Sequence, residues 1–161
     1  RPQRKFDFVT NQKQLRIRTY GNTNNVSSLA DCQYDVDGSV YESNACGLTP
    51  SIHVFVIDPI TLQPWKTTCA GGSAPIATGA ANDFCACRSR AEAYFIYRQT
   101  SNPSRDNLMN FLNAIPNGFY VGMYTMVNTQ FQNFTPAQLQ AFADMGADSV
   151  QALASTARNR P

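Results

Sequence analysis

The sequence predicts an α+β fold, in which antiparallel strands form β-sandwich-like sheets and two or three short helices follow late in the chain. Three observations lead to this prediction. Most apolar runs before residue 100 have the period of strands, two segments after residue 100 carry helix caps, and the composition suits one folded domain. The chain has 161 residues, 43% of them hydrophobic and 15% charged, which is enough for one real core.

The strands are predicted from two kinds of pattern. Residues 14–20 (QLRIRTY) and 33–41 (QYDVDGSVY) alternate apolar and polar side chains, as half-buried strands do, and Asp37-Gly38 is a turn signal within the second run. Residues 51–58 (SIHVFVID) are apolar on both faces, so this strand should be central, and the proline after it cannot donate to a ladder. Residues 93–99 (AYFIYRQ) predict a further strand.

The first helix should begin near Ser101 or Ser104, either of which could cap it, and should run to about Ile115. The Pro-Asn-Gly sequence at 116–118 ends it, because proline cannot continue a helix and glycine favours a turn with positive φ. Residues 119–124 (FYVGMY) then return to the pattern of a strand. The sequence therefore predicts a short connection from helix to sheet.

The second helix has a clearer start signal. Thr135 can act as N-cap, Pro136 occupies the first helical position and Gln138 completes a capping box, while Gly146 should end the helix. The apolar stripe expected to face the core consists of Leu139, Phe142 and Met145.

Five cysteines bear on the cellular compartment. In an oxidising compartment they would form two disulfides and leave one thiol, and a bridge from Cys69 to Cys85 or Cys87 would close the long loop at 69–83. The alternative is a metal site, but Cys85-Ala86-Cys87 has a single intervening residue where zinc pairs usually have about two to four. Disulfides are therefore favoured over metal. The disulfide candidates are Cys32, Cys46, Cys69, Cys85 and Cys87.

Charge and hydropathy exclude several classes of partner. The net charge of +2 is too small to argue for nucleic acid, and no apolar run approaches the length of about 18 residues that membrane insertion needs. Low charge with many Asn, Gln, Ser and Thr residues is typical of an extracellular surface. The chain begins with Arg1 and carries no signal peptide, so we expect a mature or excised part of a larger secreted protein.

Catalytic motifs are not evident in the sequence. It contains no Walker loop, no dinucleotide-binding glycine pattern and no metalloprotease helix. The single histidine, His53, lies within the predicted central strand, where a satisfied buried histidine is the simpler interpretation than a catalytic base. Asp35 and Asp37 are two apart on one predicted strand and should share a face, where they could bind calcium or sugar hydroxyls or simply face solvent.

Binding residues are expected where the fourth predicted strand meets the first helix. A polar cluster follows Tyr97 there, and such a cluster at a junction could form the rim of a binding site; it consists of Arg98, Gln99, Arg105 and Asp106. The aromatic residues could also form a platform on which sugars stack, although strand tyrosines are more often sheet packing. The candidates for this platform are Tyr94, Tyr97, Tyr120, Tyr124 and Trp65.

These segments, in this order, resemble the ILEI/PANDER domain, also called the GG domain. Residues 51–58 resemble the first core strand of that family, and residues 111–125 (FLNAIPNGFYVGMYT) resemble its helix-turn-strand pattern FLxxIPxGxxVxxxT. The second predicted helix resembles the family's second helix. The sequence departs from relatives at Arg98, where they carry an acidic residue, and in the cysteine-containing loop, which is an insertion.

The resemblance implies a compact β-sandwich with short helices, no catalytic activity, and binding of carbohydrate or protein ligands, as in large secreted proteins of Bacteroidota. Relatives carry a closing strand that this chain lacks, so a fragment of a larger protein is expected. Residues 1–13 would be an N-terminal extension and 14–161 the single domain.

The first functional hypothesis is therefore a non-catalytic extracellular binding module for a glycan or protein ligand, within a secreted or cell-surface protein and without a cofactor. A second is a structural or accessory domain of a multidomain secreted protease or type IX secretion component, with other domains of the same polypeptide as partners. A third, less favoured, is a cysteine-dependent enzyme or metal site at Cys85 and Cys87.

Overall fold

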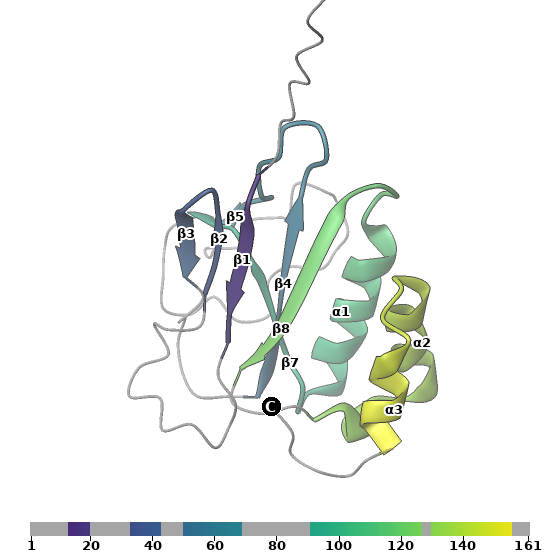
Figure 1. The fold of residues 1–161 in the computed structure, drawn as a ribbon. Helices are drawn as coiled ribbons and strands as arrows, with labels where there is room; N and C mark the ends of the chain where they lie inside the picture. The colour runs from purple at the N-terminus through teal and green to yellow at the C-terminus, as the bar shows by residue number, and fades with distance from the viewer. Residues whose placement is uncertain (1–12, 20–32, 43–49, 69–90, 127–129, 156–161) are drawn as a thin grey trace, which may run out of the picture.

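The fold was analysed in a computed structural model of the 161-residue chain (Figure 1). The structure describes residues 13–19, 33–42, 50–68, 91–126 and 130–155. Their elements, in chain order, are β1 (Leu15–Arg18), β2 (Gln33–Val36), β3 (Ser39–Glu42), β4 (Ser51–Ile57), β5 (Thr67–Thr68), β6 (Ala91–Glu92), β7 (Phe95–Arg98), α1 (Asn102–Ala114), β8 (Tyr120–Met126), the 3-10 helix η2 (Phe131–Asn133), α2 (Pro136–Asp144) and α3 (Ser149–Ser155).

The described strands form two three-stranded antiparallel sheets and a two-stranded ribbon. One sheet has the order β1-β2-β3, the second has the order β7-β4-β8, and β5 pairs with β6. The α+β class predicted from the sequence is confirmed. β4 is the central strand of its sheet and every one of its residues is buried, as its two apolar faces predicted.

Strand β4 has two apolar faces because it separates two groups of buried side chains. Ile52, Val54 and Val56 belong to one core with α1, η2 and α2, whereas Phe55 and Ile57 belong to a second core with Tyr34 and Val36 of β2. The helices therefore pack on one face of the β7-β4-β8 sheet and the β1-β2-β3 sheet packs on the other, as Figure 1 shows.

The run at 33–41 is two strands rather than one. Asp37 and Gly38 have φ angles of 52° and 78°, which is the geometry of a tight hairpin turn, and β2 and β3 pair antiparallel on either side of it. The turn signal was therefore correct, but a single strand through it was wrong. β1 also differs from its prediction, because all four of its residues are exposed, including 44% of Leu15 and 43% of Ile17.

The two predicted helices form with the predicted boundaries. Ser101 is the N-cap position of α1, although its side chain makes no capping hydrogen bond. At α2 the capping box is complete: Thr135 accepts a hydrogen bond from the Gln138 backbone, and the Gln138 side chain accepts one from the Thr135 backbone. The sequence did not predict β5, β6, η2 or α3.

Candidate functional site

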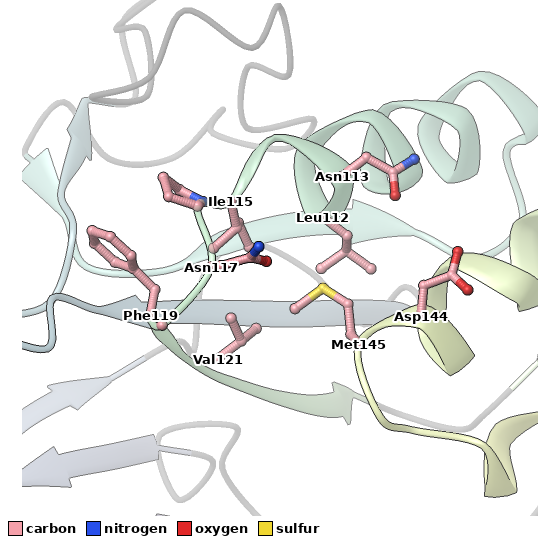
Figure 2. A pocket seen from close by; sticks show the side chains of 10 residues that line it. Leu112, Asn113, Ile115, Asn117, Phe119, Val121, Asp144 and Met145 are labelled. Carbon is pink, nitrogen blue, oxygen red and sulfur yellow. The ribbon is translucent and has the colours of Figure 1, made fainter.

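A groove lies where the ends of α1 and α2 meet the start of β8. We call it the junction groove; its volume is about 340 Å³. In Figure 2, Leu112 from α1 and Met145 after α2 face each other. Phe119, just before β8, and Val121, within β8, lie further along the groove. The lining residues are Leu112, Asn113, Ile115, Pro116, Asn117, Gly118, Phe119, Val121, Asp144 and Met145.

The groove exists because the chain leaves α1 abruptly. Ile115, the C-cap residue, has ψ of 123°, an extended conformation that a following proline favours. Gly118 has φ of 92°, which other residues rarely adopt, and the Phe119 amide donates to the Pro116 carbonyl at 3.4 Å. This turn, predicted from the sequence, connects the end of α1 directly to β8. It leaves open space beside the last turn of α1.

Polar groups at the rim of the junction groove are available to a ligand. Asn113 and Asn117 are exposed, and neither amide takes part in a side-chain hydrogen bond within the described residues. Asp144 is also exposed and accepts a hydrogen bond from Gln140 Nε2 at 2.8 Å. The floor is apolar, with Leu112 buried and Phe119, Val121 and Met145 half-buried. The groove therefore combines amide and carboxylate groups with an apolar surface.

The electrostatic character of the junction groove is negative. Among the described residues that line it, Asp144 is the charged one and none is a Lys or Arg. In addition, α1 and α2 both end here, and helix C-termini carry partial negative charge on their unpaired carbonyl groups. An anionic ligand would be repelled, whereas a neutral ligand rich in hydrogen-bond donors would be accepted.

Two residues of the rim predicted at the strand-to-helix junction, Tyr97 and Arg105, are buried, whereas Arg98 is partly exposed and Asp106 is exposed. Tyr97 is 1% exposed and its ring lies 5.8 Å from that of Phe111, so it is part of the core on the helix side of the sheet. Its position follows from strand alternation, because Tyr97 shares a face with Phe95. Arg98 is partly exposed, and its backbone amide donates to Ser104 Oγ at 2.6 Å. Tyr97 is therefore corrected from a rim residue to a core residue.

Arg105 and Asp106 lie together, as predicted, but they connect α1 to α2. Arg105 is 9% exposed and donates to the Gln99 carbonyl at 2.6 Å, while its guanidinium lies 5.5 Å from the centre of the Phe134 ring. Gln138 Nε2 donates to Asp106 Oδ1 at 2.6 Å. Most hydrogen-bond donors and acceptors of these two side chains are used within the protein, so the side chains stabilise the packing of α1 against α2.

Gln99 belongs to the polar cluster predicted as a binding rim, but it is a buried residue that bonds within the protein. Its side chain, 0% exposed, donates to the Ser51 carbonyl at 3.2 Å and accepts from the Gln130 amide at 2.6 Å. It thus ties the start of β4 to the segment that enters η2. Only its position at the end of a buried strand could have suggested this role.

Replacing Gln99 with leucine is expected to lower the free energy of unfolding by about 2–3 kcal/mol, because the buried Ser51 carbonyl and the part-buried Gln130 amide each lose a hydrogen bond. Urea denaturation followed by the fluorescence of Trp65 measures this change. The matched control is Gln132→Leu, at an exposed position of η2, which should change stability by less than about 0.5 kcal/mol. Equal effects of the two substitutions would contradict the role assigned to Gln99.

Asp35 and Asp37 do not form the predicted pair. Asp35 is 3% exposed and accepts from Arg16 Nε at 2.6 Å. Asp37 lies in the exposed turn, where it accepts from the Gln14 backbone amide at 2.8 Å and pairs with Lys13 at 3.2 Å. These two contacts, the Gln14 amide first, lower the pKa of Asp37. The prediction of a shared carboxylate face is wrong because the hairpin turn rotates Asp37 away from β2.

His53 forms a pair with a serine in the interior. Ser51 Oγ and His53 Nε2 are 3.0 Å apart, and both residues are buried, with exposures of 4% and 2%. His53 Nδ1 has no hydrogen-bond partner within the described residues. Burial lowers the pKa of His53 to about 3. The imidazole is thus neutral, enclosed between the rings of Tyr94 and Tyr124, and not oriented by a carboxylate as catalytic histidines usually are.

The remaining sequence-based predictions have mixed outcomes. Tyr94, Tyr97 and Tyr124 are buried, whereas Tyr120 is 59% exposed, so these tyrosines do not form one exposed platform. All five cysteines lie outside the described residues, and the predicted disulfides stay a prediction. Within the described ranges, no group of three or more His, Cys, Asp or Glu residues could hold a metal ion, and no helix is long and apolar enough to cross a membrane.

The junction groove was not predicted from the sequence, although the helix-to-strand connection beside it was. Asn113, Asn117 and Asp144 come from three segments, and only the tertiary fold brings them together. The exposed Asn-Gly turn was the one local signal available. Comparisons of the chain with protein-family models, with curated proteins and with solved structures found no match.

Proposed function

We propose that the protein is a non-catalytic extracellular binding module that binds a neutral glycan in the junction groove. The observation that carries this proposal is the pairing of exposed, available amides with an apolar floor in one groove. Amide and carboxylate groups can bond neighbouring sugar hydroxyls, while half-buried Phe119 and Val121 can contact the apolar C–H face of a sugar ring.

Charge favours a neutral glycan over a sulfated or sialylated one. Asp144 and the two helix C-termini make the groove negative, and no Lys or Arg offsets them among the lining residues that the structure describes. Binding an anionic sugar there would bring like charges together in a partly desolvated site, which is unfavourable. This gives the proposal a specificity that can be tested.

The non-catalytic part of the proposal is supported by the geometry of Ser51 and His53. Catalysis by such a pair needs a base that reaches substrate and holds a useful pKa. The two side chains are instead enclosed between the sheets, and neither lines the junction groove. Within the described part of the lining, Asp144 is the one carboxylate, whereas acid-base cleavage of a glycoside uses a pair.

The ILEI/PANDER-like assignment, its β-sandwich architecture and the secreted location belong to the same proposal. They are supported by the order of strands and helices and by the helix-turn-strand at residues 111–125, which matches the quoted family pattern. The accessory-domain alternative differs in that it needs no small ligand. A binding measurement on the isolated chain separates the two.

The test is a glycan array that contains neutral oligosaccharides and their sulfated and sialylated counterparts, followed by titration of the best binder. We expect binding to neutral glycans only. Asn113→Ala and Asp144→Ala should each weaken binding about tenfold, the equivalent of roughly 1.4 kcal/mol from a lost hydrogen bond.

The matched control is Asn110→Ala, which removes an exposed amide from the same helix but outside the groove. Its affinity should equal that of the unmodified protein. If no neutral glycan binds, or if Asn110→Ala and Asn113→Ala weaken binding equally, the proposal fails. Loss of binding in Arg98→Ala alone would instead locate the site at the rim first predicted from the sequence.

A further inference from the structure

The turn between α1 and β8 contains two neighbouring residues that can react with each other. Asn117-Gly118 is the one Asn-Gly pair in the sequence. Both residues are exposed, and Figure 2 shows Asn117 at the junction groove. In such a pair the backbone nitrogen of glycine can attack the side-chain carbonyl of asparagine, because glycine has no Cβ atom to obstruct the approach.

The Asn117 side chain is not held away from the backbone. Among the residues that the structure describes, none shares a hydrogen bond with its amide group. Two other exposed asparagines are held in this way: Asn102 Nδ2 donates to Asp106 at 3.1 Å, and Asn133 Nδ2 donates to Gln130 at 2.9 Å. The Asn117 carbonyl is therefore free to rotate toward the nitrogen that follows it.

The geometry of the turn leaves the Gly118 nitrogen free as well. The Phe119 amide donates to the Pro116 carbonyl, so Asn117 and Gly118 are the two central residues of a β-turn. Gly118 has φ of 92°, whereas Asn117 is not among the described residues with positive φ, and this is the pattern of a type II turn. The hydrogen bond that closes the turn uses the amide of Phe119. Loss of the Gly118 amide hydrogen therefore breaks no hydrogen bond of the turn.

The space around Gly118 also suits a reaction. A Cβ atom built on Gly118 would meet no atom of the described chain within 4 Å, so water can enter and ammonia can leave on this side of the turn. Asn113 lines the same groove and is also exposed, but it is followed by Ala114 within α1. The Ala114 amide points along the helix and donates to the helix backbone. Asn113 is therefore an internal control.

We propose that Asn117 and Gly118 form a spontaneous deamidation site that adds a carboxylate to the junction groove. The Gly118 nitrogen bonds to Cγ of Asn117, and its proton passes through water to the departing Nδ2 group. The bond from Cγ to Nδ2 breaks, and ammonia leaves. Water then opens the resulting cyclic imide at either carbonyl group, which gives aspartate or isoaspartate. The overall change is the gain of water and the loss of ammonia, without an oxidant or a reductant.

The new charge changes what the junction groove accepts. Asp144 is the one carboxylate among the described lining residues, and deamidation of Asn117 places another above the same apolar floor. A carboxylate, which only accepts hydrogen bonds, also replaces an amide that both donates and accepts them. This effect on binding rests on the proposed glycan site, whereas the modification itself does not.

The test follows the folded, full chain during incubation at neutral pH. Mass spectrometry measures the gain in mass when an amide becomes a carboxyl group, and fragmentation of the peptides distinguishes Asn117 from Asn113. We expect Asn117 to deamidate while Asn113 stays unmodified. A capped peptide of residues 114–120 (AIPNGFY) is the unfolded reference. The folded protein should react within about tenfold of the rate of this peptide, because only a turn that opposes the attack would raise the barrier further.

Two glycine variants test the role of the turn. Gly118→Ala should slow the deamidation of Asn117 by at least about tenfold, because the added Cβ atom crowds the attacking nitrogen. The matched control is Gly38→Ala, which changes another exposed turn glycine with positive φ and should leave the rate at Asn117 unchanged.

A third variant, Asn117→Asp, reproduces one product of the reaction. It should bind the best neutral glycan about tenfold more weakly than the unmodified protein, since the amide donor is lost. Unchanged affinity would overturn the effect on the groove. If no glycan binds to either protein, the proposed function fails and the deamidation site stands, because mass spectrometry detects it without a ligand.

The deamidation site itself is overturned by any of three results. The first is a rate at Asn117 in the folded protein more than about tenfold below that of the peptide, which would show that the turn prevents the attack. The second is equally fast deamidation at Asn113. The third is an equal reduction of the rate in Gly38→Ala and Gly118→Ala.

Discussion

Replacing Gly122 with alanine is expected to lower the free energy of unfolding by about 3–5 kcal/mol, the range for losing the packing of a buried phenylalanine. A Cβ atom at position 122 would lie 1.9 Å from the Cζ atom of Phe55. Gly122 and Phe55 are direct partners across β8 and β4, and the Phe55 ring lies over the glycine. The alanine methyl group therefore cannot be accommodated unless that ring moves.

Phe55 has little room to move. It is 0% exposed, and its ring stacks on Tyr34 with centroids 4.1 Å apart, in the core between the two sheets. Displacing it would disturb the contact between β2 and β4. Urea denaturation monitored by Trp65 fluorescence and by far-ultraviolet circular dichroism measures the loss of stability.

Two further variants test whether the overlap of the new Cβ atom with Phe55 causes the loss of stability, rather than another effect of replacing a glycine. Gly38→Ala meets no atom within 4 Å and should cost only the strain of its positive φ, about 1–2 kcal/mol. The double variant Gly122→Ala with Phe55→Leu should be more stable than the sum of the two single effects predicts, because the smaller side chain relieves the overlap. Additive effects in this cycle would show that the overlap is not the cause.

The order of the main elements could be predicted because each carries its signal locally. Alternation marks β2, two-sided apolarity marks β4, and the capping box marks α2. The elements that were missed lack such signals. β5 and β6 are two residues each, too short for a period, and the seven-residue α3 has no acidic first turn or basic last turn and depends on contacts with η2 and α2.

The sites were harder to predict because they depend on which face a residue occupies and on segments distant in sequence. Residue type placed Arg105 and Tyr97 at a binding rim, although Arg105 of α1 donates to Gln138 of α2 and Tyr97 packs on Phe111. Composition alone does not distinguish a polar cluster that binds a ligand from one that satisfies its own hydrogen bonds. β1 is a further case: its alternation predicted a half-buried strand, whereas all four of its residues are exposed.

Acid is expected to destabilise the protein through His53, beginning near pH 6.5. Burial lowers the pKa of His53 in the folded state to about 3, whereas an unfolded histidine titrates near 6.5. Below pH 6.5 the unfolded state therefore binds a proton that the folded state does not. Stability contributed by the neutral imidazole is complete above pH 6.5 and is lost as the pH falls toward 3, at about 1.4 kcal/mol per pH unit, or roughly 4–5 kcal/mol in total.

Other groups near His53 do not obscure this effect. Ser51 and the rings of Tyr94 and Tyr124 surround the imidazole, and none of them titrates between pH 4 and 6.5. Asp37 and Asp58 also have lowered pKa values, each chiefly through hydrogen bonds from backbone amides, so their contribution is lost at more acid pH than the usual aspartate value of 3.8. Among the described residues with a shifted pKa, the histidine therefore dominates the change in stability between pH 4 and 6.5.

The measurement is the free energy of unfolding in urea at several pH values across that window, for the unmodified protein and for His53→Phe. Phenylalanine keeps the ring contacts with Tyr94 and Tyr124 but cannot be protonated. The unmodified protein should lose stability steadily as the pH falls, and the variant should start lower, since Ser51 loses its partner, but stay nearly constant. Parallel pH curves for the two proteins would contradict the role of His53, because both would then share another titrating group.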